Sequence, residues 1–125
     1  MEIRPFKPFG SVSALTLGGG GLGKVWGETT REEAVATARL ALEQGITHFD
    51  MAPMYGRGEA ETVIGEAFKG MDTFGFRFTT KYRLGHVEPE NTYDKLNASL
   101  TRSLQTMGIE LSLIHISEPT RHDQI

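Results

Sequence analysis

The stretch "GITHFDMAPMYGRGEAETVIGEAF", residues 45–68, decides the fold that this sequence predicts. It begins with a short strand that ends at Asp50, continues through a loop that contains proline and glycine, and leads into a helix. The predicted helix covers residues 59–70 and places its apolar residues on one face. This order of strand, loop and helix is the unit from which parallel sheets are built.

The same order occurs before this stretch. Residues 11–18 are predicted as a strand that ends at Gly18, and a glycine-rich loop follows. A helix then begins at Thr30, whose hydroxyl can cap the helix while Glu33 reaches back to complete a capping box. Gly45 ends this helix, since glycine commonly adopts the left-handed conformation needed just after a last helical turn.

A third strand and a third helix follow. Residues 76–81 are predicted as a strand that ends near Lys81, and residues 87–108 contain a helix. Apolar residues at helical spacing predict the buried stripe of that helix: Tyr93, Leu96, Leu100 and Leu104. Repeated units of about 30 residues predict an α/β fold, either an open doubly wound sheet or a (β/α)8 TIM barrel. Since a barrel typically needs about 250 residues, the barrel interpretation makes this chain an N-terminal part, truncated after about three βα units.

Composition excludes several classes of function. The 125 residues carry a net charge of −3, so no basic surface for nucleic acid or acidic membranes is expected. There is no cysteine, which excludes disulfides, thiol nucleophiles and thiolate metal sites, and no metal site is predicted. No apolar run reaches the roughly 20 residues that a membrane span needs, and the N-terminus lacks a signal-peptide core. A cytoplasmic location is the simplest expectation.

The glycine run "GGGGLG", residues 18–23, formally matches the G-x-G-x-x-G pattern of dinucleotide-binding folds. That pattern needs a helix to open at its third glycine, but the predicted helix begins only near Thr30. The partner acidic residue should also follow about 20 residues later, and Asp50 lies at or beyond that range. A flexible loop is the simpler interpretation. A further alternative is that the missing side chains at Gly19 and Gly20 let a flat cofactor approach the mouth of a barrel.

Three residues form a candidate catalytic group: Asp50 ends the second predicted strand, Tyr55 lies in the loop after it, and Lys81 ends the third strand. In a parallel barrel they would converge on the C-terminal face, where functional groups gather. A free tyrosine has a pKa near 10, but a neighbouring ammonium lowers that pKa and a carboxylate can hold the ammonium in place. Such a tyrosine can protonate a carbonyl oxygen. The alternatives are a turn-forming aspartate, a half-buried loop tyrosine and a solvated lysine.

Four segments of the chain resemble the aldo-keto reductases. Residues 45–68 closely resemble their second strand, active loop and second helix, and "FTTK" resembles their lysine strand. "LTLGGGGLG" resembles their first strand and loop, and "LNASLTRSLQTMGIE" their third helix with the start of strand four. The resemblance covers roughly residues 4–110 and implies a (β/α)8 barrel that reduces aldehydes or ketones with NADPH.

The resemblance also implies a role for each matched residue. Tyr55 would be the general acid, Lys81 would lower its pKa, and Asp50 would pair with Lys81. His48 would pack within the barrel rather than act in catalysis. Three further side chains would lie near the substrate mouth or serve only as packing: Trp26, Met54 and Tyr82.

The implied cofactor is NADPH, with Gly19, Gly20 and Asp50 as its expected neighbours in this chain, and the implied substrate is a small carbonyl compound. No residue present reads the 2′-phosphate, so the preference for NADPH over NADH comes from the resemblance alone. Barrels of this family also serve as nucleotide-sensing binding subunits, such as the potassium-channel β subunits, and this alternative stays open. No oligomeric state follows from the sequence.

The final residues, 111–125, depart from the family pattern. His115 lies too close to Glu110 to be the family's catalytic histidine, because each strand residue adds only about 3.3 Å of rise. The string "LSLIHISEPTR" instead matches the translation of a transposon-based sequencing-library adapter. We therefore interpret residues 1–110 as a partial barrel domain and residues 111–125 as an adapter-derived tail. A chain of this length is expected to be inactive by itself.

Overall fold

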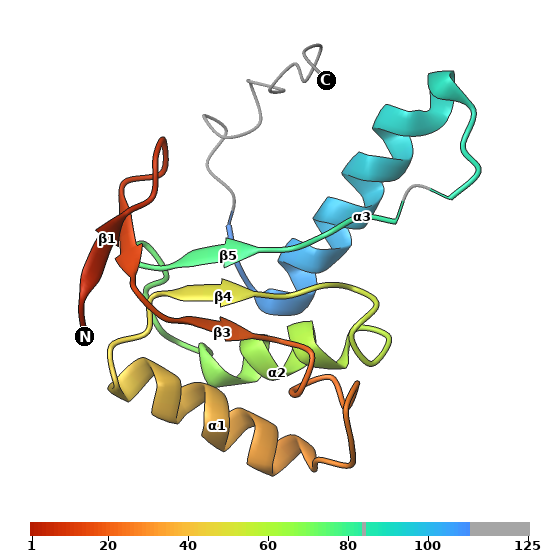
Figure 1. Cartoon of the computed structure of the whole chain (residues 1–125). Helices are drawn as coiled ribbons and strands as arrows, with labels where there is room; N and C mark the ends of the chain where they lie inside the picture. The colour runs from red at the N-terminus through yellow and green to blue at the C-terminus, as the bar shows by residue number, and fades with distance from the viewer. Residues whose placement is uncertain (84, 111–125) are drawn as a thin grey trace.

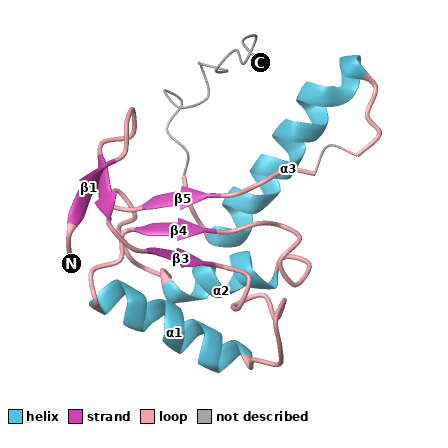
Figure 2. Ribbon diagram, in the orientation of Figure 1, coloured by secondary structure: helices cyan, strands magenta, loops and turns pink. Residues whose placement is uncertain are grey.

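The computed structural model describes residues 1–83 and 85–110, so the predicted tail and its His115 lie outside the described residues (Figure 1). The main sheet is formed by three strands: β3 (Thr16–Gly18), β4 (His48–Asp50) and β5 (Arg77–Thr79). Helices α1 (Arg31–Glu43), α2 (Glu59–Ala67) and α3 (Thr92–Met107) follow these strands in turn, and a short 3-10 helix, η1 (Pro89–Asn91), precedes α3. The predicted α/β class with three strand-helix units is confirmed for the described residues (Figure 2).

The main sheet is parallel, with the strand order β3-β4-β5. Its register aligns Leu17, Phe49 and Phe78 across the three strands, and these residues belong to or pack on the core beneath α1 and α2. Because side chains alternate between the two faces of a strand, the neighbouring positions point to the opposite face. That second face is polar: it carries Thr16, His48, Arg77, Asp50 and Thr79.

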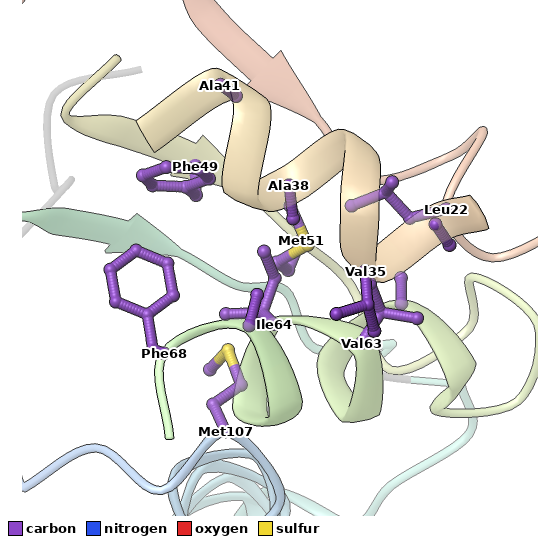
Figure 3. Close-up of a cluster of buried hydrophobic side chains, with 13 residues drawn as sticks. Leu22, Val35, Ala38, Ala41, Phe49, Met51, Val63, Ile64, Phe68 and Met107 are labelled. Atoms are coloured by element: carbon purple, nitrogen blue, oxygen red, sulfur yellow. The ribbon is translucent and has the colours of Figure 1, made fainter. Parts of the chain in front are cut away.

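The core lies between the sheet and the helices (Figure 3). Phe49 is fully buried, and its ring makes an edge-on contact with Phe68 at 5.2 Å between ring centres. Phe78 stacks on Phe49 at 5.7 Å. Full burial of such a side chain contributes about 1.5–3 kcal/mol, so this cluster fixes the spacing of the strands against α2. This packing holds in place the strands that carry polar side chains on the opposite face of the sheet.

Helix α1 begins as the sequence predicts. The Thr30 hydroxyl accepts a hydrogen bond from the Glu33 N–H at 3.2 Å, and the Glu33 carboxylate accepts one from the Thr30 N–H at 2.9 Å. These two bonds complete the predicted capping box. Helix α2 ends at Ala67, before the predicted end at residue 70. No helix within residues 1–83 and 85–110 is long and apolar enough to span a bilayer.

The single strand predicted for residues 11–18 is wrong: the segment forms two strands. Its first part is β2 (Ser11–Ser13), which pairs antiparallel with β1 (Ile3–Pro5), and its second part is β3. The Ser13 hydroxyl donates to the Leu15 carbonyl at 2.6 Å, and this local bond stabilises the bend between the two strands. The resulting hairpin lies at the end of the sheet where β3–β5 begin, and the Phe6 ring centre lies 5.1 Å from that of His48 (Figure 1).

The buried stripe predicted for α3 is also wrong in its first half. Tyr93 is 69% exposed and Leu96 is 44% exposed, whereas the buried residues of this helix are Ser103 and Met107. Only the C-terminal half of α3 packs on α2, where Gly65 admits the backbone of Thr106. The N-terminal half projects beyond the sheet, and no described element covers it (Figure 1). Spacing identified the apolar residues of the helix but not the neighbour that would bury them.

Candidate active site

The candidate site lies at the C-terminal edge of the sheet, where β4 and β5 end (Figure 1). Asp50 is the last residue of β4, and Lys81 lies two residues beyond the end of β5. The register pairs Asp50 with Thr79, so alternation along the strand brings Thr79 and Lys81 to the polar face. The Lys81 Nζ donates to Asp50 Oδ1 at 2.7 Å and to the Met51 carbonyl at 2.9 Å. The predicted contact between Asp50 and Lys81 is therefore present, whereas their role in catalysis stays a prediction.

The Lys81 ammonium also lies over Tyr55, with its Nζ 5.0 Å from the ring centre. Partial burial opposes the charged form of Lys81, but the hydrogen bond and charge of Asp50, together with the interaction with Tyr55, outweigh it. The pKa of Lys81 is consequently raised above its ordinary value. The lysine is thus a fixed cation between a carboxylate and a phenol.

The backbone of Tyr55 lies where the glycine-rich loop, residues 18–23, contacts the loop after β4. A Cβ atom at Gly23 would lie 2.5 Å from the carbonyl carbon of Tyr55, so only glycine permits this approach. Gly56 lies against the carbonyl of Gly23 from the other side and has a φ of +66°, in the left-handed region. The Gly19 N–H donates to the Asp50 carbonyl at 2.8 Å. The glycine-rich loop therefore fixes the backbone of both Asp50 and Tyr55.

The dinucleotide-fold interpretation of the glycine run is wrong. Gly23 donates to the Gly19 carbonyl at 3.0 Å within a series of turns, and α1 begins only at Arg31. No helix N-terminus therefore lies at the run, although a phosphate site of that kind requires one.

The protein's own side chains occupy the space beside two of these glycines. A Cβ at Gly19 would lie 2.6 Å from the Met51 sulfur, and one at Gly20 would lie 2.5 Å from the Trp26 ring. A side chain at either position would have to displace Met51 or Trp26, and the contact of both glycines with a cofactor stays a prediction. Gly18 differs, because a Cβ there would meet no atom of the described residues within 4 Å. The sheet surface beside Asp50 is therefore open, since Gly18 is its neighbour in register.

The other predicted residues occupy different surroundings. Trp26 is 79% exposed and Met54 is 48% exposed, while Tyr82 is half-buried next to Lys81 in sequence. Their place at a substrate mouth stays a prediction. His48 bonds through Nδ1 to the Thr16 hydroxyl at 3.0 Å and through Nε2 to the Thr79 hydroxyl at 2.9 Å. Both of its ring nitrogens thus have partners within the sheet, as expected of a packing histidine.

Sequence reasoning missed Glu61, an acidic residue in the first turns of α2. Its side chain is 3% exposed and accepts a hydrogen bond from the Thr80 hydroxyl at 2.7 Å. One signal could have found it: Glu61 stands three residues before Ile64, on the apolar face of the helix. A carboxylate is almost never buried without a partner.

The arrangement is suited to proton transfer. A phenol, an ammonium and a carboxylate lie side by side at a strand-end surface, and these are the groups that general acid catalysis by a tyrosine needs. Within residues 1–83 and 85–110, no group of histidine and acidic residues is arranged to hold a metal ion.

Known proteins match both the sequence and the fold. The family model of the aldo/keto reductase family matches residues 14–124. Aldo-keto reductase YhdN of Bacillus subtilis is 35% identical over 109 residues, which cover 78% of this chain and 32% of that protein. Methylglyoxal reductase YeaE of Escherichia coli is 36% identical over 87 residues, which cover 70% of this chain and 30% of that protein.

Solved structures agree with the sequence matches. An aldo-keto reductase from Klebsiella pneumoniae in complex with NADPH has a TM-score of 0.70 at 25% identity. The match covers 86% of this chain and 36% of that one. The chain spans about a third of the length of the curated relatives it matches. Because the family model covers most of the sequence and the structural neighbours are aldo-keto reductase barrels, the chain belongs to the aldo/keto reductase family.

Proposed function

We propose that residues 1–110 are the first part of a (β/α)8 barrel that reduces aldehydes or ketones with NADPH. The observation that carries this proposal is the position of the Lys81 ammonium. It lies 2.7 Å from the Asp50 carboxylate and 5.0 Å from the centre of the Tyr55 ring, at the edge where parallel strands end. Relatives whose names are carbonyl reductases support the same reaction class.

In the proposed reaction Tyr55 is the general acid. Its hydroxyl donates a proton to the carbonyl oxygen of the substrate, which becomes the hydroxyl of the product alcohol. The Lys81 ammonium stabilises the phenolate that remains on Tyr55, and Asp50 keeps that ammonium charged and in place. NADPH, when bound, supplies the hydride that the carbonyl carbon receives.

The residues present fit such a cofactor. Within residues 1–83 and 85–110, the surface beside Asp50 is open at Gly18, where a side-chain atom would meet nothing within 4 Å. We propose that Asp50 borders the cofactor together with the loop at Gly19 and Gly20. A structural relative was solved with NADPH, and the proposed preference for NADPH over NADH rests on that kinship.

The proposed substrate is a small carbonyl compound, and methylglyoxal is a reasonable first test because one relative is named for it. We place the protein in the cytoplasm. We further propose that residues 111–125 derive from a sequencing adapter and that a chain limited to 125 residues neither binds NADPH tightly nor turns over. The DNA sequence across codon 111 tests the adapter proposal, because it contains either adapter bases or a natural reading frame.

The test of function uses the protein expressed from the complete open reading frame. We expect NADPH absorbance to fall when aldehydes are added, and Tyr55→Phe to lower kcat by about 10²–10⁴-fold while NADPH still binds. A Tyr55→Phe protein with full activity would remove the proposed acid. A complete protein that binds NADPH but reduces no carbonyl would favour the nucleotide-sensing alternative. Fluorescence titration of the 125-residue chain tests its inactivity, and micromolar NADPH binding would contradict it.

A further inference from the structure

The end of β5 is held from both faces of the sheet. Its last ladder bond runs from the Met51 N–H to the Thr79 carbonyl at 2.7 Å. Beyond that bond, each hydrogen bond that joins residues 80 and 81 to other described residues is donated by the side chain of Thr80 or Lys81. Alternation sends Lys81 to the polar face, where it meets Asp50, and Thr80 to the helix face, where it meets Glu61.

Glu61 is an unusual residue for its place. It lies in α2 between Ala60 and Val63, both fully buried, and is itself only 3% exposed. No salt bridge to its carboxylate occurs among the described residues, and its hydrogen-bond donor is the hydroxyl of Thr80. Burying an acid costs free energy that an apolar residue of similar size would not. Such groups can instead provide specificity of position, and here the position that is fixed belongs to Thr80.

We propose that Glu61 is a positioning residue of the active site: through the Thr80 hydroxyl, its buried carboxylate fixes the strand end that carries Lys81 between Asp50 and Tyr55. Thr80 is the residue directly before Lys81, so a rotation of its backbone moves the lysine. Among the described residues, the other hydrogen bonds made by residues 80 and 81 come from the Lys81 side chain, which donates to Asp50 and to the Met51 carbonyl. The inference rests on the proposed function for its kinetic readout alone.

The decisive variant is Thr80→Val, which removes the hydroxyl with little change in shape. In the complete protein we expect kcat to fall about tenfold, because a small displacement of a catalytic group is costly, while the KM for the carbonyl stays within about twofold. Thr80→Ser and Glu61→Gln should retain most of the activity, since each keeps the donor or the acceptor of the bond.

A matched control is Thr47→Val. Thr47 also uses a part-buried hydroxyl, which accepts from the Ser13 N–H at 2.8 Å, but it precedes β4 at the opposite edge of the sheet. Thr47→Val should lower the Tm about as much as Thr80→Val does and leave kcat unchanged. If Thr80→Val also leaves kcat unchanged, or if Thr80→Ser fails to restore it, Glu61 is only a structural residue.

A second readout does not need activity. Trace acetylation at pH 8, followed by mass spectrometry, reports how available the Lys81 amine is relative to the exposed Lys95. Lys81 should react slowly in the unaltered protein and several-fold faster in Thr80→Val, but not in Thr47→Val. Equal labelling in all three proteins would overturn the inference. If the complete protein reduces no carbonyl, the proposed function fails, yet the labelling result still decides whether Glu61 positions Lys81.

Discussion

The two edges of the β3-β4-β5 sheet are built from the same three strands but are held together differently. At the N-terminal edge, Arg77 donates to the backbone carbonyls of Phe9, Phe74 and Phe76 at 2.9, 3.2 and 2.9 Å. At the C-terminal edge, Lys81 and Thr80 are held mainly by the carboxylates of other side chains. The N-terminal edge is closed by the β1-β2 hairpin, whereas the surface at Gly18 on the C-terminal edge is open.

We expect residues at the N-terminal edge to contribute mainly to stability and residues at the C-terminal edge mainly to catalysis. Hydrogen bonds to backbone carbonyls tie one part of the chain to another, so their loss is expected to reduce the free energy of unfolding. The bond between the ionised side chains of Lys81 and Asp50 fixes charges near a surface that a ligand can reach. Mutations at the two edges should therefore change different measured quantities, and four experiments can test this.

The largest effect is expected from Lys81→Met, measured in the complete protein. Without the ammonium, the phenolate of Tyr55 loses its stabilising charge, so kcat should fall by about 10²–10³-fold. The ion pair with Asp50 is more than a third exposed on each side, so the loss of stability should stay below about 1 kcal/mol. A Lys81→Met protein that unfolds readily, as judged by thermal melting, would contradict the separation of the two edges.

Gly23→Ala should lower both kcat and the thermal stability. The added Cβ would lie 2.6 Å from the Tyr55 carbonyl oxygen, so the loop that carries the tyrosine must shift. We expect kcat to fall about tenfold to hundredfold, together with a lower Tm. The control is Gly21→Ala in the same loop, where the nearest described atom to an added Cβ would be on the Trp26 ring, at 4.0 Å. Equal kcat values in the two variants would show that the loop crossing does not position Tyr55.

Arg77→Leu tests the N-terminal edge. Removing the guanidinium removes three hydrogen bonds to backbone carbonyls, which should lower the free energy of unfolding by about 1–3 kcal/mol. The kcat value should not change, because the site lies at the other edge. Urea denaturation gives the first quantity and steady-state kinetics the second. Arg4→Leu, which removes an exposed pair with Glu2, should alter neither.

The smallest effect is expected at the ion pair between the first residues of α1 and α2. Arg31 donates to both oxygens of Glu59 at 2.9 and 2.6 Å, and this hydrogen bond lowers the pKa of the Glu59 carboxyl below 4.5. A lowered pKa means that the stabilisation is present above the ordinary carboxyl pKa and is lost as the pH falls through the folded value. The Tm difference between Arg31→Met and the unaltered protein should therefore be small at pH 7 and vanish in acid. Arg39→Met on the same helix should show no such pH dependence.

Local sequence signals predicted most of the fold. The capping box at Thr30 and Glu33 marked the start of α1, and the three strand-helix units followed from apolar spacing and glycines. The hairpin was missed because proline is rare inside strands, although β1 ends at Pro5 and pairs with β2. Register between strands depends on contacts between segments distant in sequence, and no local pattern reports it.

The sequence predicted the contact between two residues of the candidate site but missed a third residue beside them. Asp50 and Lys81 were identified because each stands at a strand end, and parallel strands bring such ends together. Glu61 was missed because an acid within a helix usually faces solvent, and only the position of Thr80 gives it a partner. Tyr93 was predicted to be buried but is exposed, because helical spacing identifies an apolar face without identifying what covers it.

The Asp50–Lys81 pair joins residues that are only 31 positions apart. At a synthesis rate of about 5–20 residues per second, Lys81 is added to the growing chain within seconds of Asp50. Both members of the pair lie in the β4-α2-β5 unit or directly after it, within the first 81 residues. The charged half of the proposed catalytic group thus belongs to one contiguous supersecondary unit, which makes it a candidate for transfer into a designed barrel as a single cassette.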